Sequence, residues 1–117
     1  MVEKQARFTK TVAMFIQKAT EMGYLFTFGE AWRPPVTAQY YANLKKGISR
    51  SLHIERLAID LNAFYDGNYL NGSQQWHIPH LEKLGKLWES FGQGCAWGGR
   101  FNKKDYNHYS FEHNGIR

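Results

Sequence analysis

Ser51–Leu61 reads Ser-Leu-His-Ile-Glu-Arg-Leu-Ala-Ile-Asp-Leu, a largely apolar stretch in which a histidine and an aspartate stand out. The run Leu57–Leu61 predicts a short strand, and Asp60 lies inside it. His53 has an apolar neighbour on each side. A buried carboxylate is costly unless it is paired or bound to a cation. Taken alone, the pair is better explained without a metal, with His53 as a satisfied core or surface histidine and Asp60 as a cap or turn partner.

A second polar cluster near the C-terminus makes a metal site the better explanation. Asp105 precedes His108 by three residues, a spacing that puts two side chains on opposite faces of a regular strand. Asp105 and Asn107 are turn formers, and a bend there lets both side chains face one site. Two histidines and an aspartate give zinc three ligands and leave a fourth position for water, as in catalytic sites. The sequence thus nominates His53, Asp60 and His108 as metal ligands and Asp105 as the base that takes a proton from that water.

Helices and strands alternate irregularly around these two segments. This order lacks a regular β-α-β pattern, so we predict an α+β fold with a small antiparallel sheet flanked by helices. The predicted elements are an amphipathic helix over 8–22 closed by Gly23, strands at 24–28, 57–61 and 109–111, a helix over 37–46 ending at Gly47, a helix that begins at Pro79, and turns at 66–68 and 114–115.

The composition fits a single folded domain over residues 1–117. Hydrophobic residues make up 43% of the chain and aromatic residues 16%, which excludes intrinsic disorder. Apolar runs are only a few residues long, which excludes stable insertion into a membrane. The single cysteine, Cys95, excludes an internal disulfide and any site built from several thiolates. A bound metal must therefore take mostly histidine and carboxylate ligands.

With these residues in order, the sequence resembles the zinc peptidases that include the D-alanyl-D-alanine dipeptidases and carboxypeptidases and the phage L-alanyl-D-glutamate endopeptidases. The family pattern is Ser-x-His, a carboxylate seven residues after that His, and an acidic residue shortly before a C-terminal His. Here the first part is Ser51-x-His53 with Asp60, and the second is Asp105-x-x-His108. The match extends over most of the chain. The resemblance implies the hedgehog-like fold of the D-Ala-D-Ala peptidases.

The resemblance also implies a role for each residue of the motif. His53, Asp60 and His108 hold Zn²⁺, which polarises the scissile carbonyl and lowers the pKa of water. Asp105 accepts the proton of that water and passes it to the leaving amine. The family's dipeptidases use Glu at this position, and the phage enzymes are the closer parallel. We therefore expect activity to fall on acidification, because the histidines must be neutral and Asp105 ionised.

Two further residues are implied to contact substrate. Arg33 matches an upstream arginine that holds the oxyanion or a substrate carboxylate. Ser51 hydrogen-bonds substrate or orients His53. Arg56 departs from the pattern, since many members of the family carry Gly there. We expect this difference to alter the loop between two ligands and to leave the zinc chemistry unchanged.

The implied substrate is the stem peptide of peptidoglycan. We predict an L-alanyl-D-glutamate endopeptidase that acts as a phage endolysin, with a D-Ala-D-Ala carboxypeptidase as the alternative within the family. The N-terminal residues lack the apolar segment of a secretory signal. We therefore expect synthesis in the host cytoplasm, release by a partner that opens the membrane, and action on the cell wall in the periplasm. We also expect a monomer without a nucleic-acid partner.

The net charge of +5 keeps two other functions open. A metal-dependent nuclease is suggested by the basic charge and by the cluster Glu112-His113-Asn114, and it would bind DNA with an affinity that falls steeply with salt. A non-catalytic zinc-binding module would bind zinc without hydrolysis. The basic residues are scattered, however, and a solvated surface or attraction to an anionic cell envelope explains the charge equally well.

Several other reactive side chains have simpler explanations. His77 and His80 flank Pro79 near a helix start, where capping or solvent exposure is expected. His113 lies outside the ligand pattern, and we interpret it as a surface or second-shell residue. Glu112 is an alternative base, but its place after the last apolar residues predicts exposure. Cys95 has no histidine partner nearby in sequence, which favours an incidental free thiol.

Overall fold

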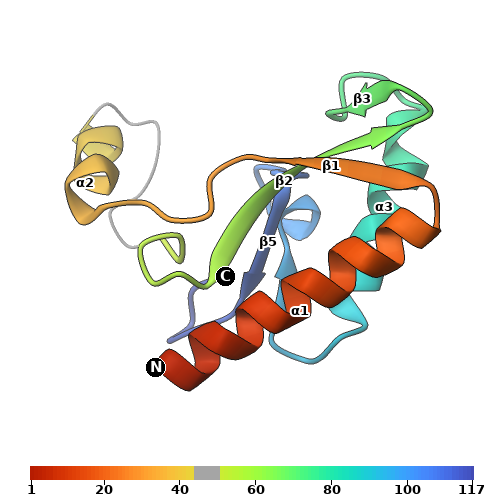
Figure 1. The fold of residues 1–117 in the computed structure, drawn as a ribbon. Helices are drawn as coiled ribbons and strands as arrows, with labels where there is room; N and C mark the ends of the chain where they lie inside the picture. Colours follow the sequence, from red (N-terminus) through yellow and green to blue (C-terminus); the bar gives the residue numbers. More distant parts are fainter. Residues whose placement is uncertain (44–50) are drawn as a thin grey trace.

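The structure of the chain, a computed structural model, describes residues 1–43 and 51–117. A curved antiparallel sheet is packed against two helices, and a third, short helix stands apart from it (Figure 1). The strand order is β1-β2-β5-β4, with β3 paired to the distal part of β2. The elements are α1 (Val2–Glu21), β1 (Tyr24–Phe28), α2 (Pro35–Asn43), β2 (Ala58–Tyr65), β3 (Asn68–Leu70), α3 (His77–Glu89), β4 (Cys95–Trp97), the 3₁₀ turn η1 (Gly98–Arg100) and β5 (His108–Phe111). The predicted α+β class is confirmed.

The first helix has the predicted apolar face but begins at Val2, six residues before the predicted start at residue 8, because the residues before Phe8 include good helix formers that need no apolar contact. Its buried residues are Phe8, Val12, Phe15 and Ala19, which recur at steps of four and three on one face. The helix ends at Glu21, and Gly23 follows with a φ of +98°, a conformation that glycine adopts without steric cost. None of the described helices is long and apolar enough to cross a membrane.

Trp88 of α3 is the centre of the core. Its ring is fully buried and meets Phe8 and Phe15 of α1 edge to face, with centroids 5.8 and 5.5 Å away. The Trp88 Nε1–H donates to the backbone carbonyl of Ser110 at 3.2 Å. Tyr109, also fully buried, completes the contact from β5. Both helices therefore hold β5 in place, and β5 begins at one of the candidate ligands, His108.

The central strand β2 is longer than the predicted 57–61 segment. It runs from Ala58 to Tyr65 because residues 61–63 continue to alternate between buried and part-exposed positions. The predicted turn that follows is confirmed as a hairpin. Asp66 and Gly67 have φ values of 51° and 78°, as the two central residues of a type I′ turn require.

Other elements also differ from the predictions, and β5 begins at His108, one residue before the predicted 109. α3 begins at His77, two residues before Pro79, because a proline in the first turn of a helix removes an N–H that has no partner there. α2 begins at Pro35 and is described to Asn43, and its predicted end at Gly47 lies outside the described residues. β4 was not predicted, since its three residues lie between glycine pairs that suggested a loop.

The histidines beside Pro79 are also less exposed than predicted. His77 is only 3% exposed, and its Nδ1 accepts the N–H of Gly72 at 3.2 Å. His80 Nδ1 lies 2.8 Å from the hydroxyl of the buried Tyr24. Both rings are therefore packing elements of the α3–hairpin contact, away from the β2–β5 pair.

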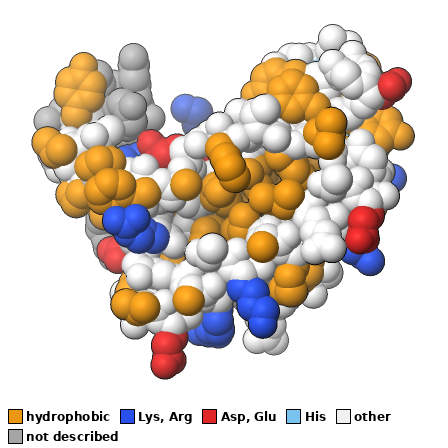
Figure 2. All heavy atoms as spheres, viewed as in Figure 1, with side chains coloured by type: hydrophobic (Ala, Val, Ile, Leu, Met, Phe, Trp, Pro, Cys, Tyr) orange, Lys and Arg blue, Asp and Glu red, His pale blue; other side chains and the backbone are white. Residues whose placement is uncertain are grey.

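Hydrophobic side chains also gather in a hollow of the surface, on the face where α1 lies in front (Figure 2). β1 is an edge strand of the sheet, and its Leu25 and Phe28 are 64% and 75% exposed. Val36 and Tyr40 of α2 are similarly exposed. The first strand and the short helix thus leave apolar area uncovered within the described chain.

Candidate metal centre

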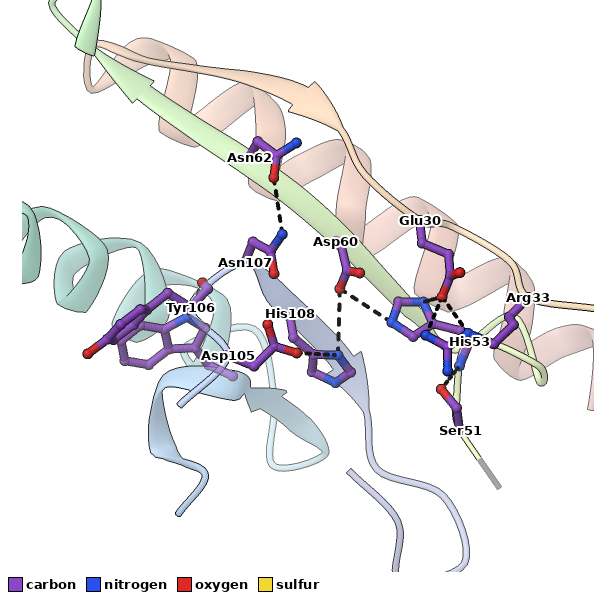
Figure 3. Close-up of polar contacts among 11 residues, drawn as sticks. Glu30, Arg33, Ser51, His53, Asp60, Asn62, Asp105, Tyr106, Asn107 and His108 are labelled. Atoms are coloured by element: carbon purple, nitrogen blue, oxygen red, sulfur yellow. Dashed lines mark hydrogen bonds and ion pairs between the residues drawn. The ribbon is translucent and has the colours of Figure 1, made fainter. Parts of the chain in front are cut away.

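Three candidate ligands converge where β2 meets β5. Asp60 of β2 lies directly opposite His108 of β5 in the antiparallel register. His53 comes from the tight turns that precede β2, and its side chain points toward Asp60 (Figure 3). One nitrogen of each ring and one Asp60 oxygen all lie within 4.8 Å of one another. Among the described residues, this is the one such group of three histidine, cysteine or carboxylate side chains.

The distances in this cluster are close to those of a metal site. His53 Nε2 lies 3.3 Å from Asp60 Oδ1, and His108 Nδ1 lies 3.8 Å from the same oxygen. Ligands bound at 2.0–2.2 Å to tetrahedral zinc are about 3.3–3.6 Å apart, so the first distance fits and the second is slightly longer. Asp60 Oδ1 is buried and makes no hydrogen bond to any described residue. A buried carboxylate oxygen that faces two ring nitrogens is an arrangement that a cation satisfies.

The backbone around Asp60 is fixed on both sides. Its carbonyl accepts the N–H of Gly29 at 2.7 Å, and its N–H donates to the Glu30 carbonyl at 2.8 Å. These bonds continue the β1–β2 pairing beyond Phe28 and Leu61. A Cβ on Gly29 would lie 2.9 Å from the Asp60 Cβ, so glycine allows this close approach. The ligand is thus held by main-chain bonds.

A turn places Asp105 beside His108, as the predicted bend required. The His108 N–H donates to the Asp105 carbonyl at 3.1 Å, and the Asp105 N–H donates to the Gly98 carbonyl at 2.9 Å. Asp105 Oδ2 is then 4.0 Å from His108 Nδ1. The Asp105 side chain is 51% exposed, so it borders the cluster and remains accessible to a substrate.

The surroundings of His108 and Asp105 set the charge state of each side chain. Burial, reinforced by the nearby His53, lowers the pKa of His108 to about 4, although Asp60 opposes the shift. His108 is therefore neutral at pH 7 and offers a lone pair. Desolvation and the Asp60 carboxylate raise the pKa of Asp105, against the lowering effects of His53 and Arg33. A raised pKa suits a carboxylate that must accept and return a proton.

The two residues predicted to contact substrate have protein partners in the structure. Ser51 is buried, and its Oγ accepts the backbone N–H of His53 at 3.2 Å. The Arg33 side chain is 14% exposed, and its Nε and Nη2 lie 2.8 and 2.6 Å from Glu30 Oε1. The same Glu30 oxygen is 3.7 Å from His53 Nδ1. Sequence reasoning missed Glu30, whose only signal was an arginine three residues later.

The alternative base lies on another part of the surface. Glu112 follows β5 at the end opposite His108, and its backbone carbonyl accepts a bond from Lys4 Nζ at 2.8 Å. The same amine is 3.1 Å from His113 Nδ1. Glu112 and His113 are thus tied to the N-terminal helix. Cys95 is half-buried in β4, and burial raises the pKa of its thiol to about 11, which suits the predicted incidental role.

Comparisons with known proteins agree with this arrangement. A family profile described as D-alanyl-D-alanine carboxypeptidase matches residues 45–111, more than half of the chain. The chain belongs to the D-alanyl-D-alanine carboxypeptidase family. The matched segment of this family member contains the three candidate ligands and Asp105. The family resemblance predicted from the sequence is thereby confirmed.

A solved structure is similar to this family member in fold. It is the Serratia marcescens L-Ala D-Glu endopeptidase ChiX, with a TM-score of 0.58 and 19% sequence identity. The alignment covers 74% of this chain, which spans 66% of the length of that protein. No curated protein matches the chain by sequence. The similarity supports the predicted α+β fold, which resembles that of this endopeptidase.

Proposed function

We propose that this protein is a zinc-dependent peptidase that cleaves the stem peptide of peptidoglycan, at the bond between L-Ala and D-Glu. One observation carries the proposal, namely the convergence of His53 Nε2, Asp60 Oδ1 and His108 Nδ1 with Asp105 at its border. Membership of the D-alanyl-D-alanine carboxypeptidase family supports the reaction class. The name of the similar structure, an L-Ala D-Glu endopeptidase, supports the choice of bond.

Each residue of the cluster has a defined task in this proposal. His53, Asp60 and His108 hold the metal through two neutral nitrogens and one carboxylate oxygen. Bound zinc supplies a Lewis acid that polarises a carbonyl and acidifies water. Asp105 accepts a proton from the attacking water and delivers it to the leaving amine. The half-exposed position of Asp105 leaves room for the substrate on its open side.

Arg33 and Ser51 have supporting tasks. The contact between Ser51 Oγ and the His53 N–H favours the orienting role for this serine over direct substrate binding. The Arg33 N–H donates to the carbonyl of His53 at 3.2 Å, and this position beside a ligand supports a role near the reacting carbonyl. Its contact with Glu30 holds the guanidinium in a fixed position.

We also propose the setting in which the enzyme works. It acts as a monomeric phage endolysin on the cell wall, after release from the cytoplasm in which it is made. A net charge of +5 supports attraction to an anionic envelope.

Digestion of purified peptidoglycan tests the proposal. Incubation with the zinc-loaded protein should release peptides with a new D-Glu N-terminus, identified by mass analysis, and a chelator should stop their release. Release of free D-Ala would instead assign the D-Ala-D-Ala carboxypeptidase activity that the family name suggests. Zinc binding without any product would indicate a non-catalytic module. Cleavage of DNA with intact peptidoglycan would favour the nuclease.

Substitutions separate the metal ligands from the base. H53A and H108A should lose stoichiometric zinc, because each removes one of three ligands. D105N should keep zinc and lose turnover by about 10²–10⁴-fold, the usual contribution of a general base. D66N is a matched control, since Asp66 lies in the exposed hairpin turn. Full zinc content in both histidine variants, or near-normal turnover in D105N, would refute these assignments.

A further inference from the structure

His53 lies between two carboxylates, and only one of them belongs to the ligand cluster. Its Nε2 faces Asp60 Oδ1 at 3.3 Å, and its Nδ1 faces Glu30 Oε1 at 3.7 Å (Figure 3). The ring is 3% exposed, so solvent barely competes for either nitrogen. His53 Nδ1 is buried without a closer polar partner in the described chain. The carboxylate of Glu30 is therefore the acceptor available to this nitrogen.

Glu30 matters to His53 because a histidine that binds a metal through one ring nitrogen keeps its proton on the other. A neutral imidazole has one N–H and one lone pair, and a carboxylate accepts hydrogen bonds only. Without a metal, Asp60 lies closer to Nε2 than Glu30 lies to Nδ1, and the two carboxylates compete for the proton. With a metal on Nε2 the proton must be on Nδ1, where Glu30 is the acceptor. Nε2 is the nitrogen that points toward Asp60 and the metal cluster.

Arg33 holds the Glu30 carboxylate in this position. Its Nε and Nη2 both contact Oε1, the oxygen that faces His53. The two residues also fix the backbone of the ligands. The Arg33 N–H donates to the His53 carbonyl at 3.2 Å, and the Glu30 carbonyl accepts the Asp60 N–H at 2.8 Å. A side chain held by two bonds from a planar guanidinium is well placed to orient another group.

We propose that Glu30 is a positioning residue that accepts the Nδ1–H of His53 when Nε2 binds the metal and thereby raises the affinity of the cluster for zinc. Arg33 restrains Glu30 and balances its charge. This inference rests on the metal site of the proposed function. The competing explanation is that Glu30 and Arg33 form an ordinary ion pair that stabilises the loop after β1.

Three variants of the full chain separate these explanations. E30A removes the acceptor, whereas E30Q retains an amide oxygen that can accept the same N–H. E82Q is the matched control, because Glu82 forms a comparable pair with Arg100 and has no histidine partner. Zinc affinity is measured by competition with a chromophoric chelator. The proton on His53 Nδ1 is observed by ¹⁵N–¹H NMR of the zinc-loaded protein, and stability is measured by urea unfolding.

The expected result is graded. E30A should weaken zinc binding by about 10–100-fold, the usual effect of losing such a partner, and E30Q should lose less. The His53 Nδ1–H signal should be sharp in the zinc-loaded wild type and broadened by exchange in E30A, while E82Q changes neither property. Equal zinc affinity and an unchanged Nδ1–H signal in E30A would overturn the inference. If E30A fails to fold, the same two readouts in E30Q decide it. A wild-type protein that binds no zinc would refute the proposed function, whereas zinc bound equally by the wild type and E30A would refute only this inference.

Discussion

Arg56 has a left-handed backbone conformation, with a φ of 58°, in the turn that joins His53 to β2. The turn folds back tightly, since the Leu57 N–H donates to the Leu52 carbonyl at 3.0 Å. The Arg56 guanidinium lies 4.4 Å from the centre of the Trp32 ring, which provides a cation–π contact. Glycine adopts this φ without steric cost, whereas an arginine at the position is strained.

This conformation predicts an unusual order of stability for two substitutions. R56A keeps the strained φ and loses the contact with Trp32, whereas R56G loses the same contact and relieves the strain. R56G should therefore be more stable than R56A by about 1 kcal/mol, a difference of about 4 °C in Tm for a chain of this length. Thermal unfolding of the two purified variants measures it. Equal melting temperatures, or a more stable R56A, would show that the turn carries no such strain.

The sequence alone identified four residues of the site and missed a fifth. His53, Asp60, Asp105 and His108 were identified because ligand-type side chains interrupt apolar runs at a spacing typical of one family. Glu30 carries no such local signal. Its importance depends on the pairing of the segment after β1 with Asp60, a long-range contact that no pattern of neighbouring residues predicts.

At the scale of elements, the 3₁₀ turn η1 supports the turn that carries Asp105. A Cβ added at Gly98 would overlap the Asp105 carbonyl oxygen and lie 2.8 Å from the His108 Cβ. The Gly98 carbonyl meanwhile accepts the N–H groups of Asp105 and Phe101. The glycine thus allows η1 and the 105–108 turn to pack with their backbones in contact.

Substitution of Gly98 should disturb the metal site although Gly98 is not a ligand. G98A forces the 105–108 turn away from η1, because backbone atoms cannot rotate aside, and we expect a loss of about 1–3 kcal/mol in unfolding free energy. Zinc affinity should fall as well, since His108 moves with the turn. G94A is the matched control, because a Cβ there meets nothing within 4 Å. Urea unfolding and chelator competition measure both effects. Unchanged zinc affinity in G98A would show that the turn does not depend on this contact.

Periodicity predicted the longer elements and failed for the shortest ones. α1 follows its apolar pattern because it buries one continuous face against the core. In β1 only Tyr24 is buried, and the strand forms through its pairing with β2. β4 has three residues, and its pairing with β5 rather than its own composition makes it a strand. β2 extends past Leu61 for a similar reason, since β1 and β3 pair with its distal part.

At the scale of the whole molecule, burying His108 links the stability of the fold to pH. The pKa of this histidine is about 6.5 in an unfolded chain and about 4 in the folded, metal-free protein, where burial disfavours the charged form. Between these values the unfolded chain binds more protons than the native state. The free energy of unfolding therefore rises with pH in this window, and it decreases as the pH falls from about 6.5 toward 4.

The metal-free protein should accordingly lose up to about 3 kcal/mol of stability over this range through His108 alone. The shift at Asp105 acts with the opposite sign, because a carboxyl with a raised pKa holds more protons in the native state. Comparison with H108Q isolates the histidine, since both proteins retain Asp105. Urea unfolding at several pH values in the presence of a chelator should give a steeper decline for the wild type. Parallel declines would show that His108 does not titrate with a lowered pKa. Saturating zinc should raise the stability of the wild type at pH 7, because the metal binds the folded state and requires the neutral ring.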